Sequence, residues 1–334
     1  MAQRPPLKLP DYIQGNLCCP NCSQKLEFEN NNFGCIDPSC SAKFPVIDGI
    51  PVLLNDQNSL FAIETAVRQN SVMKLLRRQS QIHTGLVDRF LDWLSSNIPD
   101  ISKNINAQEN FIKFSKILTS LTDRQSVLVV GGSVMGQGME PLYEDPQITM
   151  VESDVVFGPR TMMIFDAHDI PFIDETFDGV IIQAVLEHVV DPYRCVDEIH
   201  RVLKDQGIVY AETAFMQQVH GGRYDFLRFT HSGHRHLFRK FQEIDSGVAC
   251  GPGMALAWSY QYFLASFFDS KRIIQFAKIF ASITSFFLKY FDKYLINKPG
   301  ALDAASAFFF MGQKSEIPLE NNELKSYYRG GQLG

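Results

Sequence analysis

Four of the five cysteines in the first 40 residues constrain the fold of this chain more than any other feature. They form two pairs, Cys19-Pro-Asn-Cys22 and Cys35-Ile-Asp-Pro-Ser-Cys40, and each pair spans one tight turn. Tetrahedral zinc binds four thiolates, and two such turns bring them together without a large apolar core. The spacing therefore predicts a zinc ribbon in residues 1–56, with Cys19, Cys22, Cys35 and Cys40 as ligands of one structural Zn²⁺.

The neighbouring Cys18 is a spare thiol, but Cys19 directly precedes the proline of the first turn and makes the better pair. Disulfide bonds are a weaker alternative, because thiols stay reduced in the cytoplasm. We expect a cytoplasmic protein, since residues 1–10 are polar and rich in proline. The longest uncharged stretch, residues 246–268, begins with glycines and a proline. Its apolar part is shorter than the about 20 residues that a spanning helix needs.

The segment after the cysteines reads Phe44-Pro-Val-Ile-Asp-Gly-Ile-Pro-Val-Leu-Leu54. Together with the two pairs, it resembles the small zinc-ribbon family that includes the activator subunit of eukaryotic tRNA and translation-factor methyltransferases. It also resembles the ribbon at the front of many bacterial methyltransferases. The resemblance covers about residues 15–55, and it implies that the ribbon is structural and is not the place of methyl transfer.

Short apolar runs that alternate with helical connections follow further along the chain. The runs lie at Ser126–Val130, Ile148–Val151, Met162–Phe165, Gly179–Ile182 and Gly207–Glu212, with a late one at Ala304–Met311. This alternation predicts an α/β domain with a mostly parallel sheet in residues 126–316.

Two helical segments flank or interrupt this domain. Residues 57–125 carry apolar residues at helical spacing, between Leu75 and Leu94 and again between Phe111 and Leu118. A strongly aromatic segment, residues 252–302, is inserted before the last strand. The polar, glycine-rich residues 317–334 are expected to form a flexible tail.

Two glycines follow the first apolar run of the α/β domain. Gly131 and Gly132 let the backbone approach a ligand where a strand opens onto a helix N-terminus. Glu152 ends the next run, 20 residues after Gly132. At that spacing a carboxylate can accept hydrogen bonds from a ribose diol. The pattern favours a nucleoside-binding edge, whereas Glu152 alone could equally be a solvated charge.

Later motifs resemble those of the class I S-adenosylmethionine-dependent methyltransferases. They are Asp166-Ala-His-Asp-Ile-Pro-Phe172, Phe177-Asp178, Leu186-Glu-His188 and Arg201-Val-Leu-Lys-Asp-Gln-Gly207. The resemblance spans residues 125–215 and implies a Rossmann-like sheet with an antiparallel last strand and S-adenosylmethionine as cofactor.

The resemblance also implies roles for single residues. Gly131 and Gly132 would face the cofactor, Glu152 would bind its ribose, Asp166 and Ala167 would hold the adenine, Gln183 would line the methionine end, and His188 would border the methyl-transfer site. The chemistry agrees, because adenine needs an acceptor beside an apolar slot and the diol needs a carboxylate.

Two departures from the family pattern leave alternatives open. Val129 stands where the family usually has an acid, and Gly131-Gly-Ser-Val-Met-Gly136 replaces Gly-x-Gly, so the contacts at the methionine end are open. Only 13 residues separate Glu152 from Asp166, which predicts a vestigial second helix. A non-catalytic scaffold is therefore one alternative. A nicotinamide dinucleotide is another, disfavoured because Gly-x-Gly-x-x-Gly is missing.

The segment His220-Gly-Gly-Arg-Tyr-Asp225-Phe-Leu-Arg228 resembles one in bacterial methyltransferases of surface-polysaccharide and related pathways. An acceptor hydroxyl or amine must lose a proton, and histidine titrates nearest to pH 7. His220 is the first candidate base and His188 the second. The alternative is that Asp225 and Arg228 brace the loop. Three more histidines are expected on the surface of a helix: His231, His234 and His236.

These patterns predict a methyltransferase for a small-molecule, glycan or lipid-linked acceptor. The net charge of −6 disfavours the RNA-directed alternative, since nucleic-acid binding needs a basic excess. The inserted segment 252–302 carries six basic and two acidic residues and eight phenylalanines. It is therefore expected to lie on an anionic membrane from the inner face, or to pack internally or in a homodimer.

Overall fold

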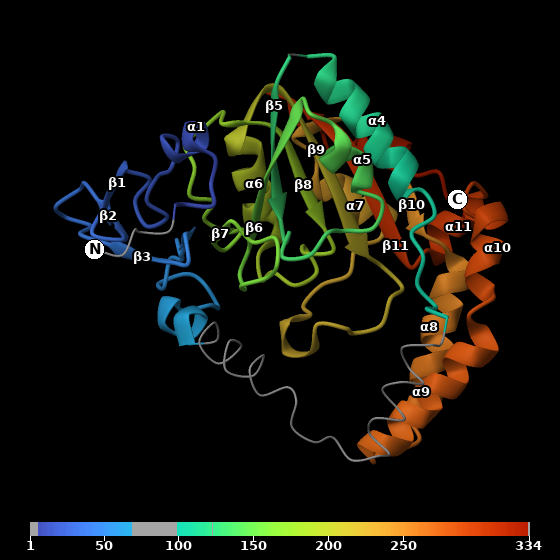
Figure 1. Ribbon diagram of the computed structural model, residues 1–334. Coiled ribbons are helices and arrows are strands. Elements are labelled where there is room, and N and C mark those ends of the chain that lie inside the picture. Colours follow the sequence, from blue (N-terminus) through green and yellow to red (C-terminus); the bar gives the residue numbers. More distant parts are fainter. Residues whose placement is uncertain (1–5, 69–98, 122, 333–334) are drawn as a thin grey trace.

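The computed structural model describes residues 6–68, 99–121 and 123–332, which form an α/β fold around a seven-stranded sheet (Figure 1). The strand order is β10-β11-β9-β8-β5-β6-β7, and β11 runs in the opposite direction to the other six strands. The strands are β5 (Gln125–Val130), β6 (Ile148–Asp154), β7 (Met163–Ile164), β8 (Phe177–Gln183), β9 (Leu203–Ala214), β10 (Phe241–Cys250) and β11 (Ala307–Lys314). The predicted Rossmann-like sheet with an antiparallel strand near its end is confirmed.

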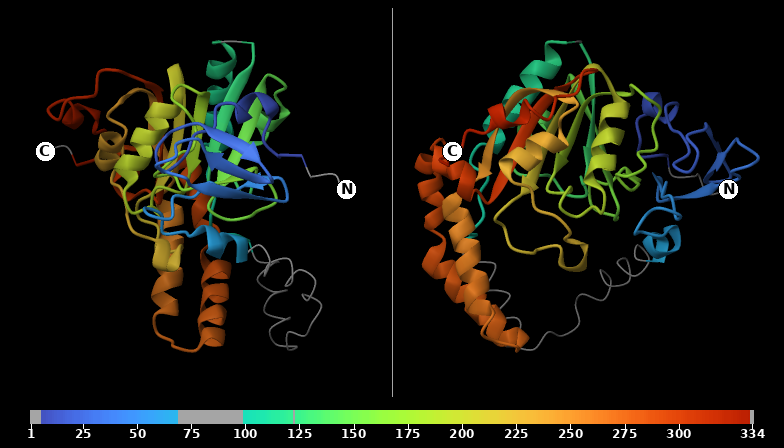
Figure 2. Two further views of the ribbon diagram at one scale, coloured as in Figure 1. Left: turned by 90° about the vertical axis from the view of Figure 1, so that its left-hand side faces the viewer. Right: turned by 180° about the vertical axis from the view of Figure 1, so that it is seen from behind.

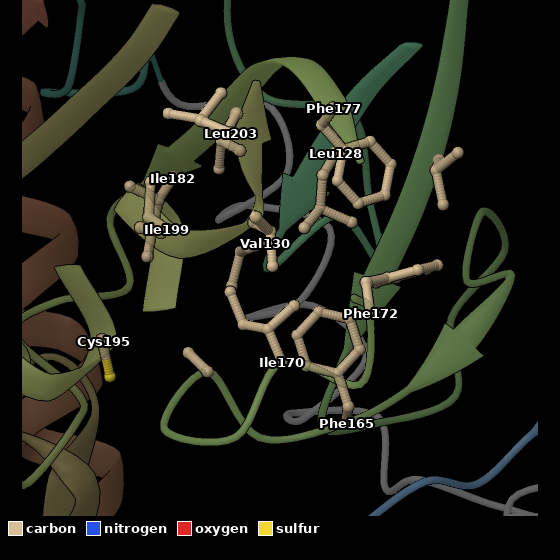
Figure 3. Close-up of a cluster of buried hydrophobic side chains, with 14 of the residues drawn as sticks. Leu128, Val130, Phe165, Ile170, Phe172, Phe177, Ile182, Cys195, Ile199 and Leu203 are labelled. Carbon is tan, nitrogen blue, oxygen red and sulfur yellow. The ribbon is translucent and has the colours of Figure 1, made fainter. Parts of the chain in front are cut away.

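Helices cover both faces of the sheet because side chains alternate along each strand. Leu128 and Val130 of β5 pack on one face with α6 (Pro192–Val202) and α7 (His231–Leu237), as Figure 3 shows in part. Val127 and Val129 pack on the other with α4 (Ala107–Thr119) and α5 (Glu140–Glu144). The α4 residues Phe111, Phe114 and Leu118 are buried, which matches their predicted helical spacing. The residues between Leu75 and Leu94 lie outside the described ranges.

The N-terminal ribbon has its own small sheet in the order β1-β2-β3-β4. Its elements are α1 (Asp11–Gln14), β1 (Leu26–Glu29), β2 (Asn32–Cys35), β3 (Lys43–Ile47) and β4 (Ile50–Pro51). The ribbon is joined directly to the large sheet, because Val52 bridges to Ile164 of the edge strand β7 and the Leu53 amide donates to the Ile164 carbonyl at 2.8 Å. Apolar residues of both parts form one continuous cluster.

Four helices are inserted between β10 and β11: α8 (Pro252–Ala265), α9 (Lys271–Ser285), α10 (Leu288–Leu295) and α11 (Pro299–Ala304). We call α8–α10 the cap. Figures 1 and 2 show α8 and α9 projecting past the sheet, on the side where the β9–α7 loop lies. The buried carboxylate of Asp292 fixes the start of α8 by accepting from the Gly253 and Met254 amides at 2.6 and 3.0 Å. No single described helix has the length and apolarity of a membrane span, but α9 and α10 together, bent by 48°, meet both criteria.

The sequence made predictions about the connection between β6 and β7 and about the chain after β11. Residues 155–162, between β6 and β7, contain no helix, so the predicted loss of the second helix is confirmed. After β11 the chain forms a 3₁₀ helix, η2 (Leu324–Tyr327), and the Tyr328 hydroxyl donates to Asp303 at 2.7 Å. The flexibility of residues 317–334 stays a prediction.

Candidate functional site

Two adjoining cavities lie at the carboxyl ends of the parallel strands, the edge where open α/β sheets bind ligands. The larger has a volume of about 430 Å³, and its walls come from the ends of β5 to β8 and from residues 221–224. The smaller, about 290 Å³, lies nearer to α8. Val130, Gly131 and Ala184 line both cavities, which therefore meet above the end of β5.

The glycine turn after β5 forms the floor where the cavities meet. Gly131 has φ +82°, and a Cβ there would lie 2.3 Å from Cγ2 of Val185, so both the backbone and the space require glycine. The Gly131 and Gly132 amides donate to the Ser153 carbonyl at 2.9 and 2.7 Å, which ties this turn to β6. Gly131 lines both cavities, whereas Gly132 is buried behind it.

Glu152, the predicted ribose ligand, is buried in β6 with 2% of its surface exposed. Its carboxylate accepts from Arg160 Nε at 2.6 Å and from the Tyr143 hydroxyl. Asp154, which the sequence reasoning missed, is the acid of β6 that lines the larger cavity. Its position two residues after Glu152, on the same face of the strand, was the available signal. The ribose role of Glu152 stays a prediction.

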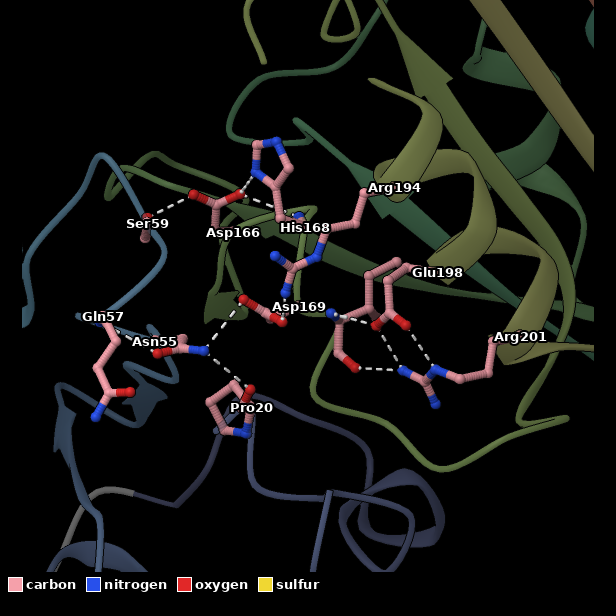
Figure 4. A network of polar contacts seen from close by, with 11 residues as sticks. Pro20, Asn55, Gln57, Ser59, Asp166, His168, Asp169, Arg194, Glu198 and Arg201 are labelled. Carbon is pink, nitrogen blue, oxygen red and sulfur yellow. Dashed lines mark hydrogen bonds and ion pairs between the residues drawn. The ribbon is translucent and has the colours of Figure 1, made fainter. Parts of the chain in front are cut away.

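Asp166 and Ala167, the predicted adenine residues, line the larger cavity beside His168. Asp166 Oδ1 lies 2.6 Å from His168 Nδ1, and Oδ2 accepts from the Ser59 hydroxyl (Figure 4). Burial alone would raise the pKa of Asp166, but the hydrogen bonds from His168 and Ser59 lower it below its usual value. Asp166 therefore presents a carboxylate next to the apolar Ala167.

The same wall is tied to the ribbon. Asn55 donates to Asp169 Oδ2 at 3.2 Å and to the Pro20 carbonyl at 3.3 Å, and Arg194 of α6 pairs with Asp169 (Figure 4). Further along, the Phe61 ring lines the cavity and stacks on Tyr224 with ring centroids 5.5 Å apart. The segment that leaves the ribbon therefore forms part of the cavity.

Gln183, the predicted methionine-end residue, lies in the smaller cavity with Glu212 and Asn104. Its Nε2 donates to Glu212 at 3.0 Å, and Asn104 donates to the same carboxylate at 2.7 Å. The buried Gln183 Oε1 and Asn104 Oδ1 have no hydrogen-bond partner among the described residues. Because buried polar atoms are normally paired, these two oxygens are unsatisfied acceptors beside the smaller cavity.

The candidate bases His188 and His220 are brought together with Glu187. The two Nε2 atoms lie 3.1 Å apart, and His220 Nε2 is 3.8 Å from Glu187 Oε1. His188 lines the larger cavity, and burial lowers its pKa. Burial also raises the pKa of Glu187, to about 7. The sequence reasoning quoted Glu187 only as part of a motif and did not assign it to the site.

The loop around His220 is held by a buried brace, the alternative role considered for Asp225 and Arg228. Asp225 accepts from the His220 amide at 2.8 Å and pairs with Arg228. Its pKa is lowered, because the Arg228 hydrogen bond outweighs partial burial. The surface position predicted for His231 and His234 is wrong, since both are buried against the phenylalanines of β11, and only His236 is half-buried.

The four ribbon cysteines converge on one point. The sulfurs of Cys19 and Cys40 are 3.7 Å apart and those of Cys22 and Cys35 are 3.4 Å apart, and all four lie within 4.8 Å of one another. Tetrahedral thiolates about 2.3 Å from zinc would be about 3.8 Å apart, so the sulfurs fit one ion. Cys18 is buried elsewhere, and its amide bonds to the Pro171 carbonyl.

A family model described as a methyltransferase domain matches residues 145–211, which contain most of the cavity wall from β6 to β8. A UPF0434 protein of Pseudoalteromonas translucida (strain TAC 125) is 34% identical over 55 residues, which are 16% of this chain and 85% of that protein. This match fits the ribbon. The chain therefore contains a class I methyltransferase domain, and its ribbon belongs to the UPF0434 family.

Several solved structures align with this chain at low identity. A protein assigned as a sarcosine dimethylglycine methyltransferase from Galdieria sulphuraria aligns at 12% identity and TM-score 0.42, covering 70% of this methyltransferase and 99% of that chain. The [4+2]-cyclase SpnF aligns at 16% and 0.38, covering 70% and 93%. A chain from the Haloferax volcanii complex of the Trm112 methyltransferase activator with a methyltransferase aligns at 16% and 0.35, covering 68% and 98%. At these scores the similarities carry no argument about substrate or partner.

Proposed function

We propose that this methyltransferase binds S-adenosylmethionine across the two cavities and methylates an oxygen or nitrogen of a small-molecule, glycan or lipid-linked acceptor. When bound, the cofactor supplies an electrophilic methyl group on a sulfonium. The larger cavity would hold the adenosine, with Asp166 accepting from the adenine amino group and Ala167 against its ring. The acidic end of β6 would hold the ribose diol.

The observation that carries this proposal is the pair of unpartnered oxygens in the smaller cavity, on Gln183 and Asn104. The amino group of a methionine end is a cationic donor of the kind that such oxygens and the neighbouring Glu212 would bind. This arrangement would replace the acid that the family usually has where Val129 stands. The methyl group would then point toward His188 and His220, which are placed to receive the acceptor's proton.

Calorimetric titration of the whole chain with S-adenosylmethionine and S-adenosylhomocysteine tests the proposal. We expect one site per chain for both compounds, and weaker binding in Gln183→Leu, which removes the orphan oxygen at similar volume. Absence of binding would favour the second candidate, a non-catalytic scaffold. One observation favours the scaffold: the Glu152 carboxylate already accepts hydrogen bonds from Arg160 and Tyr143.

We further propose that the protein is cytoplasmic and binds peripherally to a membrane. The cap would lie on this membrane and receive the methyl acceptor from it. Large aromatic side chains of the cap are exposed among the described residues: Phe263, Phe267, Phe276, Phe280, Phe291 and Tyr294. Lys271 and Lys293 are exposed on α9 and α10, and Lys298 is exposed just after α10. Basic helices with exposed aromatic residues bind anionic bilayers.

The cap also touches the proposed acceptor end of the cavity. Tyr262 of α8 donates to the Val219 carbonyl at 2.6 Å, and Gln218 donates to Ser259 at 2.9 Å. An acceptor anchored in the bilayer would therefore be delivered beside His220.

Co-sedimentation with anionic and neutral vesicles tests this part. We expect salt-sensitive binding to the anionic vesicles only, and weaker binding of Phe267→Ser/Phe280→Ser. The matched control is Phe226→Ser, an exposed phenylalanine outside the cap. Equal binding of the variant and the parent, or no binding to either vesicle, would contradict the membrane proposal and favour a buried dimer contact.

A further inference from the structure

We propose that Glu187, His188 and His220 bind one divalent transition-metal ion, separate from the ribbon zinc. The ligand atoms of these three side chains all lie within 4.8 Å of one another. Glu187 and His188 follow β8, and His220 comes from the loop after β9, so the sheet topology brings together groups more than 30 residues apart.

The hydrogen bonds of the two rings leave their lone pairs facing each other. His188 Nδ1 lies 2.9 Å from the Tyr224 carbonyl, and His220 Nδ1 lies 3.2 Å from the Gln218 carbonyl. A carbonyl can only accept, so each Nδ1 carries the hydrogen and each neutral ring has its lone pair on Nε2. Two such lone pairs 3.1 Å apart repel each other unless a cation lies between them.

The distance between the two nitrogens fits ligands of one ion, whereas Glu187 Oε1, 3.8 Å from His220 Nε2, would move closer when the ion binds. With metal–nitrogen bonds of about 2.1 Å, two cis nitrogens are about 3.0 Å apart at a right angle and about 3.4 Å apart in a tetrahedron. The observed 3.1 Å lies between these values. Glu187 supplies the third ligand, because its side chain is 1% exposed and its buried Oε2 has no hydrogen-bond partner among the described residues.

The local charge also favours a cation. Arg228, whose charge acts on Glu187, is paired with Asp225, and within the described ranges no lysine or arginine forms an ion pair with Glu187. Asp225 Oδ2 lies 3.6 Å from His220 Nδ1, on the side of the ring away from Nε2, where a carboxylate stabilises a metal-bound histidine. Two imidazoles and one carboxylate form the ligand set of catalytic zinc and of non-haem iron.

Three protein ligands leave coordination positions open, and His188 lines the larger cavity. Resting on the proposed function, the ion would bind the acceptor's hydroxyl oxygen and lower its pKa. The hydroxyl would release its proton to solvent, and its oxygen would form the new bond to the methyl carbon as the sulfur–carbon bond breaks. With the ion bound, the two histidines would be its ligands, and solvent would replace them as the proton acceptor of the proposed function.

The test is a zinc count on the full chain, without S-adenosylmethionine, by elemental analysis after equilibration with buffered Zn²⁺. We expect two zinc ions in the wild type and in the His236→Ala control, and one in His220→Ala. His220 lies on a loop with a quarter of its side chain exposed, so this variant should fold, and Glu187→Gln provides a second, shape-preserving change. Calorimetric titration with Zn²⁺ should show the second site weakened about tenfold or more in both variants.

One zinc in the wild type, or equal zinc affinity in the wild type and His220→Ala, would overturn the metal site. The rings would then share a proton. Loss of S-adenosylmethionine binding with the second zinc retained would instead refute the proposed cofactor and leave this site standing.

Discussion

Two clusters of possible metal ligands differ in how many coordination positions the protein itself fills. The ribbon brings together four cysteines from two turns, with the outermost pair 21 residues apart, and all four tetrahedral positions are supplied by the chain. The Glu187–His188–His220 cluster supplies three groups and opens onto a cavity. Closed sites generally stabilise folds, whereas open ones bind substrates. The number of converging side chains therefore assigns a structural role to the ribbon cluster and a substrate-binding role to the Glu187–His188–His220 cluster.

The largest loss of stability should come from removing one of the four ribbon cysteines. In Cys40→Ser the ribbon should lose its zinc and unfold, because metal binding supplies about 10 kcal/mol or more of folding free energy in small zinc domains. Elemental analysis and limited proteolysis of residues 15–55 measure this. His220→Ala should leave the ribbon protease-resistant. A protease-resistant ribbon in metal-free Cys40→Ser would contradict the structural role.

His231 and His234 of α7 differ from the histidines of the open cluster, because they are buried and line neither of the two cavities. Burial lowers the pKa of His231 to about 4 and that of His234 to about 3. The unfolded chain, with histidine pKa about 6.5, then binds more protons at pH 4–6.5, so stability is complete above this range and falls on acidification. Each histidine should cost about 2 kcal/mol between pH 7 and pH 5.

Denaturant unfolding of His234→Leu checks this at both pH values. The variant should lose less stability on acidification than the wild type. His236→Leu, on the same helix but half-buried, is the control and should behave as the wild type does. Equal acid sensitivity of His234→Leu and the wild type would show that His234 is not buried as a neutral ring.

A third prediction tests Glu152 as the residue that binds the cofactor's ribose. Glu152→Ala should weaken S-adenosylmethionine binding by about 1.5–3 kcal/mol, the scale of a charged hydrogen bond. It should also lower the melting temperature, because Arg160 loses its buried partner. Glu144→Ala, an exposed acid with the same charge change, is the control. Unchanged affinity would remove Glu152 from the site and favour Asp154 as the ribose ligand.

The smallest effect concerns the contact between the two regions. Phe61, which follows the ribbon, stacks on Tyr224, which follows the open cluster. Phe61→Leu keeps apolar volume but removes the ring pair, and should weaken cofactor binding by about 1 kcal/mol. Calorimetry measures this, and Leu60→Ala, which removes a neighbouring wall residue without a ring, is the comparison. A larger loss in Leu60→Ala would mean that apolar volume, not stacking, closes the cavity.

Local patterns in the sequence predicted much of this molecule. The cysteine pairs and the alternation of apolar runs with helices depend on neighbours within a few residues, so the ribbon, the sheet and the missing second helix could be predicted. The structure places four predicted residues at a cavity, all of them within five residues of the end of a strand: Asp166, Ala167, Gln183 and His188.

What the sequence did not predict depends on distant partners. His231 and His234 are buried because β11, more than 70 residues later, places phenylalanines against them. The convergence of Glu187 with His220 requires β8 and β9 to be neighbours, with their loops leaving the same edge. The contact of Ser59 with Asp166 spans 107 residues, and no local pattern reports it.

The bridge from Val52 to Ile164 covers an exposed border of the large sheet. β7 has two residues and is the outermost strand on its side, so its free backbone groups could pair with another chain. The ribbon takes up that pairing, since the Leu53 amide donates to the Ile164 carbonyl. Release of zinc would free this border, and the first consequence would be self-association of the sheets, seen as light scattering that increases with protein concentration.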